Sequence, residues 1–159
     1  RSSLRMRPDR IVVGEVRDEA AIDMLQALNT GHDGSLSTGH ANSSKDMLSR
    51  LESLVLMGSD IPLIAIRKQI ASALDIIVHL GRLRDRSRRV LEISEVLECI
   101  DGEIQIQSLF EFVEVSEDEN GHIHGVFQKT GDLSKVDKLK KAGFMSYEKT
   151  CSKKDSYRK

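Results

Sequence analysis

Two side chains suited to phosphate and proton chemistry end short apolar runs near the start of the chain. Glu15 ends RIVVGE at residues 10–15, and His40 ends SLSTGH at residues 35–40. A carboxylate at the end of an apolar strand is the usual position of the acid that works with magnesium and water in phosphate-transferring ATPases. An imidazole donates a hydrogen bond to a phosphate oxygen in either charge state. Taken alone, Glu15 is explained equally well as a strand-end carboxylate that pairs with an arginine.

His40 belongs to the stretch GHDGSLSTGHA, residues 31–41, which is small, polar and rich in glycine. Glycines let the backbone turn sharply or come close to a ligand. A second imidazole, His32, precedes His40 by eight positions. This spacing is longer than in typical zinc sites and no cysteine ligand is near, so we do not expect zinc.

The pattern around Glu15 and His40 predicts a strand, a helix and a second strand. Residues 10–15 are expected to form a buried strand, and residues 35–40 a second strand. Asp18 can cap the helix between them, and Gly31 is expected to stop it. A strand–helix–strand unit implies a parallel sheet, in which successive strands end at the same edge. We therefore expect one site at this edge, with room for a phosphate and a water between the carboxylate and the imidazole. The side chains expected to converge there are Glu15, Arg17, His40 and Asn42.

Two further helices and three longer strands follow. Ser43 and Asp46 form a capping box for a helix that Gly58 ends, and its stripe of Met and Leu residues is interpreted as core. Pro62 suits the first turn of the next helix. Strands are expected at residues 75–83, 88–100 and 103–115.

The remaining elements are predicted from turn and cap signals. Asp-Gly at 101–102 and Asn-Gly at 120–121 predict hairpins. Ser134 and Asp137 are expected to cap a last short helix that ends at Gly143. His79 is interpreted as a strand residue, and His122 and His124 as surface residues.

Composition limits the classes of function. The formal net charge of −1 gives no overall field that would attract nucleic acid or anionic lipid. No apolar run approaches the length of a membrane span, and no signal peptide is present. Cys99 and Cys151 are far apart and lack a metal-binding pattern, so we interpret them as reduced thiols.

A cluster of arginines between two predicted strands requires an interpretation. Clustered arginines can bind nucleic-acid phosphates. No aromatic residue is interleaved and acidic residues follow closely, which favours a solvated hairpin or a face between subunits of a ring. The cluster comprises Arg82, Arg84, Arg86, Arg88 and Arg89.

Residues 4–43, LRMRPDRIVVGEVRDEAAIDMLQALNTGHDGSLSTGHANS, closely resemble the CpaF/TadA branch of the type II/IV secretion ATPases, a GspE/VirB-like family. The resemblance continues through residues 51–96 and more faintly to Gly143. In that family IVVGE is an atypical Walker B strand, and GHDGSLSTGHANS is the histidine box. The TadA meant here is the pilus motor.

The resemblance implies roles, cofactors and partners. Glu15 would position or activate the attacking water and help hold Mg²⁺ through water, with no direct protein ligand to the metal. His40 would face the γ-phosphate of ATP. The family forms homo-hexameric rings at the cytoplasmic side of the bacterial inner membrane, with a platform protein of a pilus or secretion system as partner and no nucleic acid. Other residues expected in the vicinity of the γ-phosphate are Arg17, His32, Thr38 and Asn42.

The sequence departs from the family pattern in two ways. The family usually carries a glutamate five residues after the Walker B acid, whereas this chain has Ala20 there, with Glu19 beside it. The P-loop motif G-x-x-x-x-G-K-[ST] is absent, because the chain contains no Gly-Lys dipeptide. In the family the P-loop lies upstream, so we expect Arg1 to mark a truncation and the fragment alone to be inactive.

The fold class expected is α/β: the C-terminal part of a RecA-like P-loop NTPase domain with a parallel sheet core, followed by helices and an antiparallel β-hairpin region. We expect residues 1–100 to belong to the RecA-like domain, residues 101–143 to form hairpins and a short helix, and residues 144–159 to be a flexible basic tail. The leading hypothesis is a fragment of an ATPase for pilus assembly or protein secretion. Two alternatives are a ring-interaction module that has lost hydrolysis, and a RecA-like nucleic-acid translocase.

Overall fold

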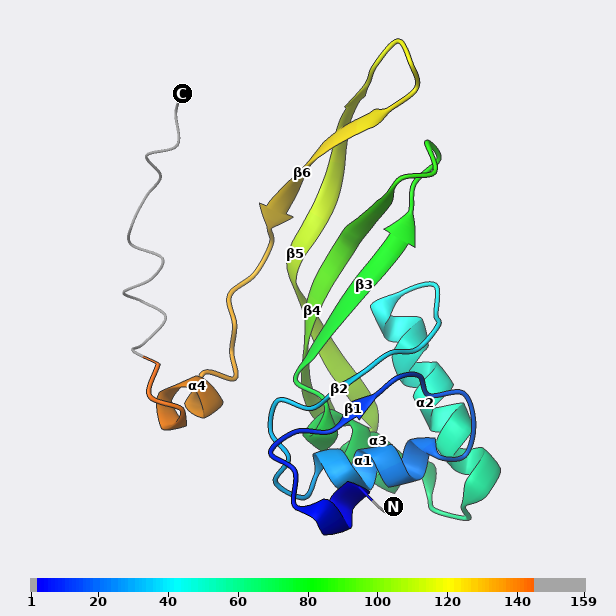
Figure 1. Cartoon of the computed structure of the whole chain (residues 1–159), viewed down its shortest axis with the longest axis vertical. Coiled ribbons are helices and arrows are strands. Elements are labelled where there is room, and N and C mark those ends of the chain that lie inside the picture. Colours follow the sequence, from blue (N-terminus) through cyan, green and yellow to red (C-terminus); the bar gives the residue numbers. More distant parts are fainter. Residues whose placement is uncertain (1–2, 145–159) are drawn as a thin grey trace.

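A short parallel sheet and three helices form one end of the molecule in the computed structural model, which describes residues 3–144 (Figure 1). The two short strands pair in parallel, with Val12 opposite Leu36 and Val13 opposite Ser37. A helix joins them, so the predicted strand–helix–strand unit is confirmed. The elements of this part are η1 (Ser3–Met6, a 3-10 helix), β1 (Val12–Val13), α1 (Ala21–Leu28) and β2 (Leu36–Ser37).

The prediction that the first strand is buried is wrong. Val12 is 74% exposed and Leu36 is 65% exposed. Among the described residues, β1 and β2 pair only with each other, so their apolar side chains have little to pack against. Val16, three residues beyond the strand, is buried because it joins the helical core beside Leu25 and Leu51.

The predicted boundaries of α1 are close but shifted. The Asp18 carboxylate accepts a hydrogen bond from the Ala20 N–H at 2.9 Å, which orders the turn that leads into the helix. The helix ends at Leu28, before Gly31. Gly31 has a φ of +83°, and it turns the chain after the helix has ended.

Helices α2 (Ser44–Gly58) and α3 (Leu63–Ala73) supply most of the core. The Ser43 hydroxyl accepts a hydrogen bond from the Asp46 N–H at 3.0 Å, which confirms the predicted N-cap. The Met and Leu stripe of α2 is core except at its end, where Met57 is exposed. The buried side chains of the two helices are Ser44, Leu48, Leu51, Leu54 and Val55 of α2, and Ile66, Ile70 and Ala71 of α3.

A four-stranded antiparallel sheet rises away from the helices (Figure 1). Its order follows the chain, and Val96 at its lower end packs into the helical core. Asp101 and Gly102 both have positive φ angles, as the predicted Asp-Gly hairpin requires. Residue 100, the predicted domain boundary, lies within this sheet, and the boundary stays a prediction. The strands are β3 (Ile76–Arg82), β4 (Arg88–Ile100), β5 (Glu103–Glu117) and β6 (Ile123–Lys129).

After β6 the chain returns to the helices and forms α4 (Asp137–Lys141). The buried carboxylate of Glu95 accepts hydrogen bonds from the backbone N–H groups of Ser134 at 2.8 Å and Lys135 at 2.6 Å. The prediction that Ser134 caps the last helix is therefore wrong, because a strand residue distant in sequence holds this segment. The helix begins after Val136 without a side-chain cap.

No helix within residues 3–144 is long and apolar enough to cross a membrane. The predicted flexible tail, apart from Phe144, lies outside the described residues.

The arginine-rich segment is an exposed hairpin between β3 and β4, as predicted. Arg84 donates hydrogen bonds to Glu114 and, at 2.8 Å, to Glu117 of β5. Arg82 Nε donates to the backbone carbonyl of Arg86 at 3.1 Å. The alternative of a face between ring subunits stays a prediction.

Asp85 ties this hairpin to the next one. Its carboxylate accepts hydrogen bonds from the Ile123 N–H at 2.9 Å, the Ser87 N–H at 2.9 Å and the Ser87 hydroxyl at 2.6 Å. These bonds, the one from Ile123 most strongly, lower the pKa of Asp85 from 3.8 to about 2. The charged form of Asp85 therefore stabilises the join between the β3–β4 turn and the start of β6.

We expect Asp85→Asn to lower the melting temperature at pH 7 by about 3 °C or more and to speed amide exchange at Ile123. Because folding lowers the pKa of Asp85, its contribution is fully present above about pH 4 and is lost as the pH falls toward 2. The difference between the two proteins should therefore shrink below pH 4. Asp101→Asn, which removes a charge from another turn, is the control. An Asp85→Asn protein with normal Ile123 exchange at pH 7 would contradict this role.

Candidate functional site

Glu15, Arg17 and His40 meet at the carboxyl ends of β1 and β2. His40 Nε2 lies 3.1 Å from Glu15 Oε1, and the Arg17 guanidinium donates a hydrogen bond to Glu15 Oε2. The Glu15 side chain is 20% exposed and that of His40 is 81% exposed. The carboxylate therefore lies at the buried side of the site, and the imidazole lies at the side that is open to solvent.

Positive charge surrounds the carboxylate. The hydrogen bond from Arg17 is the largest cause that lowers the pKa of Glu15, and the charges of Arg17, His40 and Arg50 act in the same direction, partly offset by burial. The contact raises the pKa of Arg17. Glu15 is therefore ionised at neutral pH, which suits a carboxylate that orients water better than one that stores a proton.

Backbone pairing brings the acid and the imidazole together. The Val16 N–H donates to the Thr38 carbonyl at 3.0 Å, and the Thr38 hydroxyl donates to the Gly14 carbonyl. These bonds hold the residues that follow β1 alongside those that follow β2. Gly14 and Val16 flank Glu15, so Thr38 holds the backbone on both sides of this residue.

Gly39 lets helix α2 pack close to the loop that carries His40. A Cβ atom on Gly39 would lie 2.5 Å from Met47 Cε and 2.9 Å from Met47 Sδ. A side chain at this position would require the flexible end of the Met47 side chain to move. The glycine just before His40 therefore lets the Met47 side chain of α2 pack close against the histidine loop.

Two of the predicted residues lie outside the acid–imidazole contact. His32 Nδ1 is 3.1 Å from the Ala27 carbonyl, because the chain turns at Gly31 and folds the imidazole back onto the end of α1. Asn42 is exposed and has no hydrogen bond with another described residue. Their placement near a phosphate stays a prediction.

The expectation of open space between Glu15 and His40 is wrong in this structure, because the two side chains touch. A charged carboxylate and an imidazole N–H satisfy each other directly when nothing lies between them. Since His40 is mostly exposed, the imidazole can leave Glu15 without disturbing the core.

Sequence analysis missed Arg50, whose charge lowers the pKa of Glu15 from helix α2. A signal was present. Arg50 follows Met47 by three positions, so both lie on the same side of α2, and Met47 packs under the histidine loop.

The donor set limits how a metal could bind. Within residues 3–144, no group of three or more His, Cys, Asp or Glu side chains could hold a metal ion. Glu15 offers one carboxylate, already flanked by cationic groups. Such a site fits a divalent cation only if water and ligand oxygens fill most of its coordination sphere.

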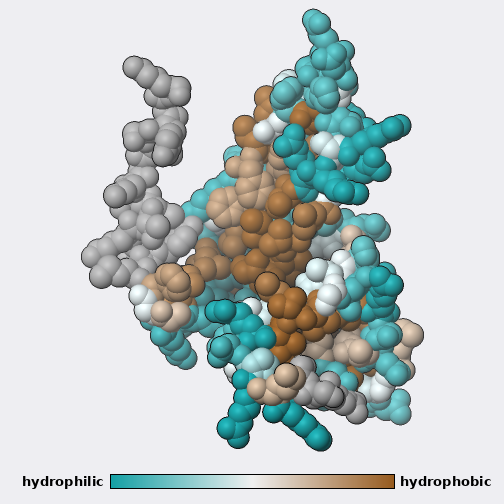
Figure 2. Space-filling model, viewed as in Figure 1, coloured by the Kyte–Doolittle hydropathy of each residue, from teal (hydrophilic) through white to brown (hydrophobic). Residues whose placement is uncertain are grey.

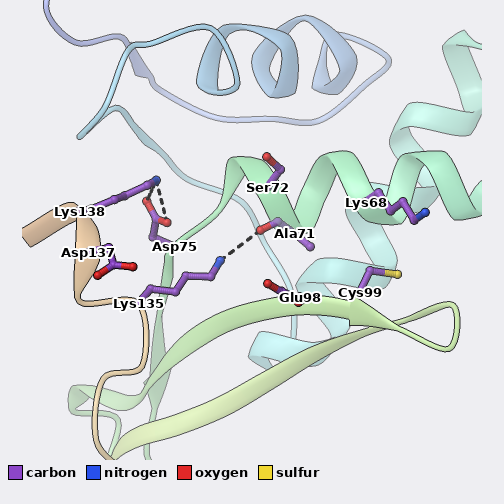
Figure 3. Close-up of a pocket in the computed structure, with 9 residues that line it drawn as sticks. All are labelled: Lys68, Ala71, Ser72, Asp75, Glu98, Cys99, Lys135, Asp137 and Lys138. Atoms are coloured by element: carbon purple, nitrogen blue, oxygen red, sulfur yellow. Dashed lines mark hydrogen bonds and ion pairs between the residues drawn. The ribbon is translucent and has the colours of Figure 1, made fainter. Parts of the chain in front are cut away.

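A hollow of about 440 Å³ between α3, β4 and α4 is a less suitable site (Figure 3). Lys135 Nζ donates to the Ala71 carbonyl at 3.3 Å, and Lys138 Nζ lies 2.7 Å from Asp75. Acidic side chains, including Glu98, balance its lysines. No excess of charge there selects a ligand.

Two known proteins are similar to this chain over most of its length. The chain is 38% identical over 128 residues to a putative conjugal transfer protein of Mycobacterium tuberculosis, which covers 80% of this chain and 36% of that protein. It is 44% identical over 108 residues to the probable conjugal transfer protein TrbB of Sinorhizobium fredii, covering 68% of this chain and 32% of that protein. The chain thus spans about a third of the length of these relatives.

A solved structure is also similar. The VirB11 ATPase of the Brucella suis type IV secretion system, in complex with sulphate, matches with a TM-score of 0.55 and 33% identity over 58% of this chain and 29% of that one. The likeness agrees with the expected RecA-like α/β class, whereas the CpaF/TadA branch stays a prediction. A family model described as type II/IV secretion system protein matches residues 1–152. The chain therefore belongs to the type II/IV secretion system protein family.

Proposed function

We propose that the chain is the C-terminal part of the motor domain of a hexameric ATPase that powers protein secretion or pilus assembly. The observation that carries this proposal is the 3.1 Å contact between His40 Nε2 and Glu15 Oε1 at the carboxyl ends of two parallel strands. Ligands of open α/β sheets bind at this edge. The similar proteins include conjugal transfer proteins and a VirB11 ATPase, which supports the same function.

In this proposal Glu15 orients the water that attacks the γ-phosphate of ATP. Its pKa is lowered, so it is ionised at neutral pH and accepts a hydrogen bond from that water. A carboxylate with a low pKa is a weak base, so its main contribution is orientation. Through water, its charge also helps hold the Mg²⁺ that accompanies the phosphates and supplies Lewis-acid chemistry to them.

His40 exchanges its partner when nucleotide binds. In the structure its Nε2 faces Glu15, and the side chain is 81% exposed. We propose that the imidazole leaves Glu15 and donates a hydrogen bond to an oxygen of the γ-phosphate. The same movement frees the carboxylate for water.

The lysine and backbone amides that cradle the phosphates must come from outside these residues. The 159-residue chain lacks a P-loop motif and spans about a third of the length of its relatives. We propose that the motif lies in a longer ATPase that contains these residues. The 159 residues alone should then show no ATP turnover above background.

The surface supports a domain completed by further chain. Hydrophobic side chains gather over the strands that face the viewer in Figure 2. Val12, Leu36, Val78 and Leu80 are each exposed by 48% or more, which is a large apolar area for a self-contained domain. A hollow of about 360 Å³, lined mostly by apolar residues, separates β2 from β3.

The proposed assembly is a homo-hexamer on the cytoplasmic face of the bacterial inner membrane, where a platform protein of a pilus or secretion system receives the motion. No nucleic acid takes part. The similarity to the VirB11 ATPase of a type IV secretion system supports a role in secretion.

Replacing Glu15 by Gln in the longer ATPase should abolish turnover, a loss of at least about 100-fold, while ATP binding stays within about threefold. The substitution keeps the shape but removes the charge that orients water. Steady-state hydrolysis and equilibrium ATP binding measure the two effects. Glu119→Gln, on an exposed turn, is the matched control. Near-normal turnover of Glu15→Gln would show that Glu15 has only a structural role at the end of the strand.

Replacing His40 by Ala in the longer ATPase should slow turnover by roughly ten- to a thousandfold, as expected for the loss of one transition-state donor. Melting temperature and ADP affinity should hardly change, because His40 is exposed and ADP has no γ-phosphate. His122→Ala, which removes an exposed imidazole from a distant hairpin, is the control. Lower stability with unchanged turnover per folded molecule would show that His40 only braces the loop.

A further inference from the structure

Four of the residues that line a cavity of about 420 Å³ beside His40 are basic and none is acidic, and the rest are apolar or small. It lies between the loop that carries His40 and strand β3. His79, Arg82 and Arg88 line it together with His40. Arg82 and Arg88 carry two full positive charges on one face of the strand pair, and the His79 side chain points to the other face of β3.

Arg82 and Arg88 stand directly opposite each other in the β3–β4 pair. Like charges at opposed positions of a sheet destabilise it. Within residues 3–144 neither arginine forms an ion pair, although Arg84 of the same hairpin pairs with Glu114 and Glu117. Acidic partners are thus within reach of this hairpin, yet the two arginines that line the cavity have none.

An anion between the two exposed side chains would offset the repulsion between them, and the Arg82 Nε already donates to the Arg86 carbonyl at 3.1 Å. Guanidinium groups match the oxygens of phosphate in a two-pronged geometry. The cavity volume of about 420 Å³ exceeds what a single carboxylate fills and lies within the range of small-molecule sites. Because His40 forms one wall, a phosphate chain in the cavity would reach the imidazole.

We propose that Arg82 and Arg88 bind the phosphate chain of a nucleoside triphosphate, on the side of His40 that faces away from Glu15. This inference rests on the proposed function, because it takes His40 to face the same phosphates. It assigns two arginines of the exposed hairpin to the ligand and leaves Arg84 as a structural ion-pair partner.

The test uses the longer ATPase and inorganic tripolyphosphate, with binding measured by calorimetry at low salt. The wild-type chain should bind, and the double substitution Arg82→Gln and Arg88→Gln should weaken binding by at least about tenfold. Arg89→Gln removes the same charge one position away, where successive side chains point to opposite faces, and should weaken binding by less than about threefold. Normal unfolding of each variant verifies its fold.

Three results would overturn the proposal. The wild-type chain might bind no tripolyphosphate up to millimolar concentration, or Arg89→Gln might weaken binding as much as the double substitution. The third is a double variant that binds normally but changes its state of association, which would assign the arginines to an acidic surface of another subunit. The measurement involves no turnover, so it is separable from the hydrolysis tests of Glu15 and His40.

Discussion

The parallel pairing of β1 with β2 is the constraint on which the candidate site depends. This pairing continues beyond the strands, because the Val16 N–H donates to the Thr38 carbonyl at 3.0 Å. It therefore sets the relative position of the backbone segments that carry Glu15 and His40. Side chains alternate between the faces of a strand, so a slip of one residue would turn Glu15 away from His40. The contact between the acid and the imidazole thus follows from backbone register.

Helix packing maintains this register from below. α1 connects the two strands, and its Leu25 shares a core with Val16, the residue next to Glu15. The Met47 side chain of α2 packs against the histidine loop at Gly39. The sheet of β3–β6 is joined to this base by Val96 in the core and by Glu95, which holds the returning chain. Rigid elements therefore position a site whose outer side chain, His40, is free to move.

Local signals predicted most of the elements, and contacts distant in sequence account for the errors. The Ser43 cap and the Asp101-Gly102 turn depend on neighbouring residues and could be predicted. The Ser134 cap failed because Glu95, on another strand, binds that backbone. The exposure of Val12 depends on which strands lie beside β1, and the local sequence pattern does not contain this information.

The same distinction applies to the site. The meeting of Glu15 with His40 followed from one rule, that parallel strands end at the same edge. Their direct contact depends on side-chain conformation, and the influence of Arg50 depends on how α2 lies against the loop, so neither was predicted. The arginine cluster was treated as one surface feature, although strand pairing divides it into Arg84, which has acidic partners, and the pair that lines the cavity.

We propose that Glu15 and His40 act as one unit on the same phosphate. A double-mutant cycle of ATP turnover tests it most directly, using Glu15→Asp, which keeps the charge but shifts the carboxylate, and His40→Ala in the longer ATPase. When two residues act together, the turnover rate of the double variant falls by far less than the product of the two single decreases. We predict that the double variant is no more than about threefold slower than the slower single variant. Single losses that multiply in the double variant would contradict the account.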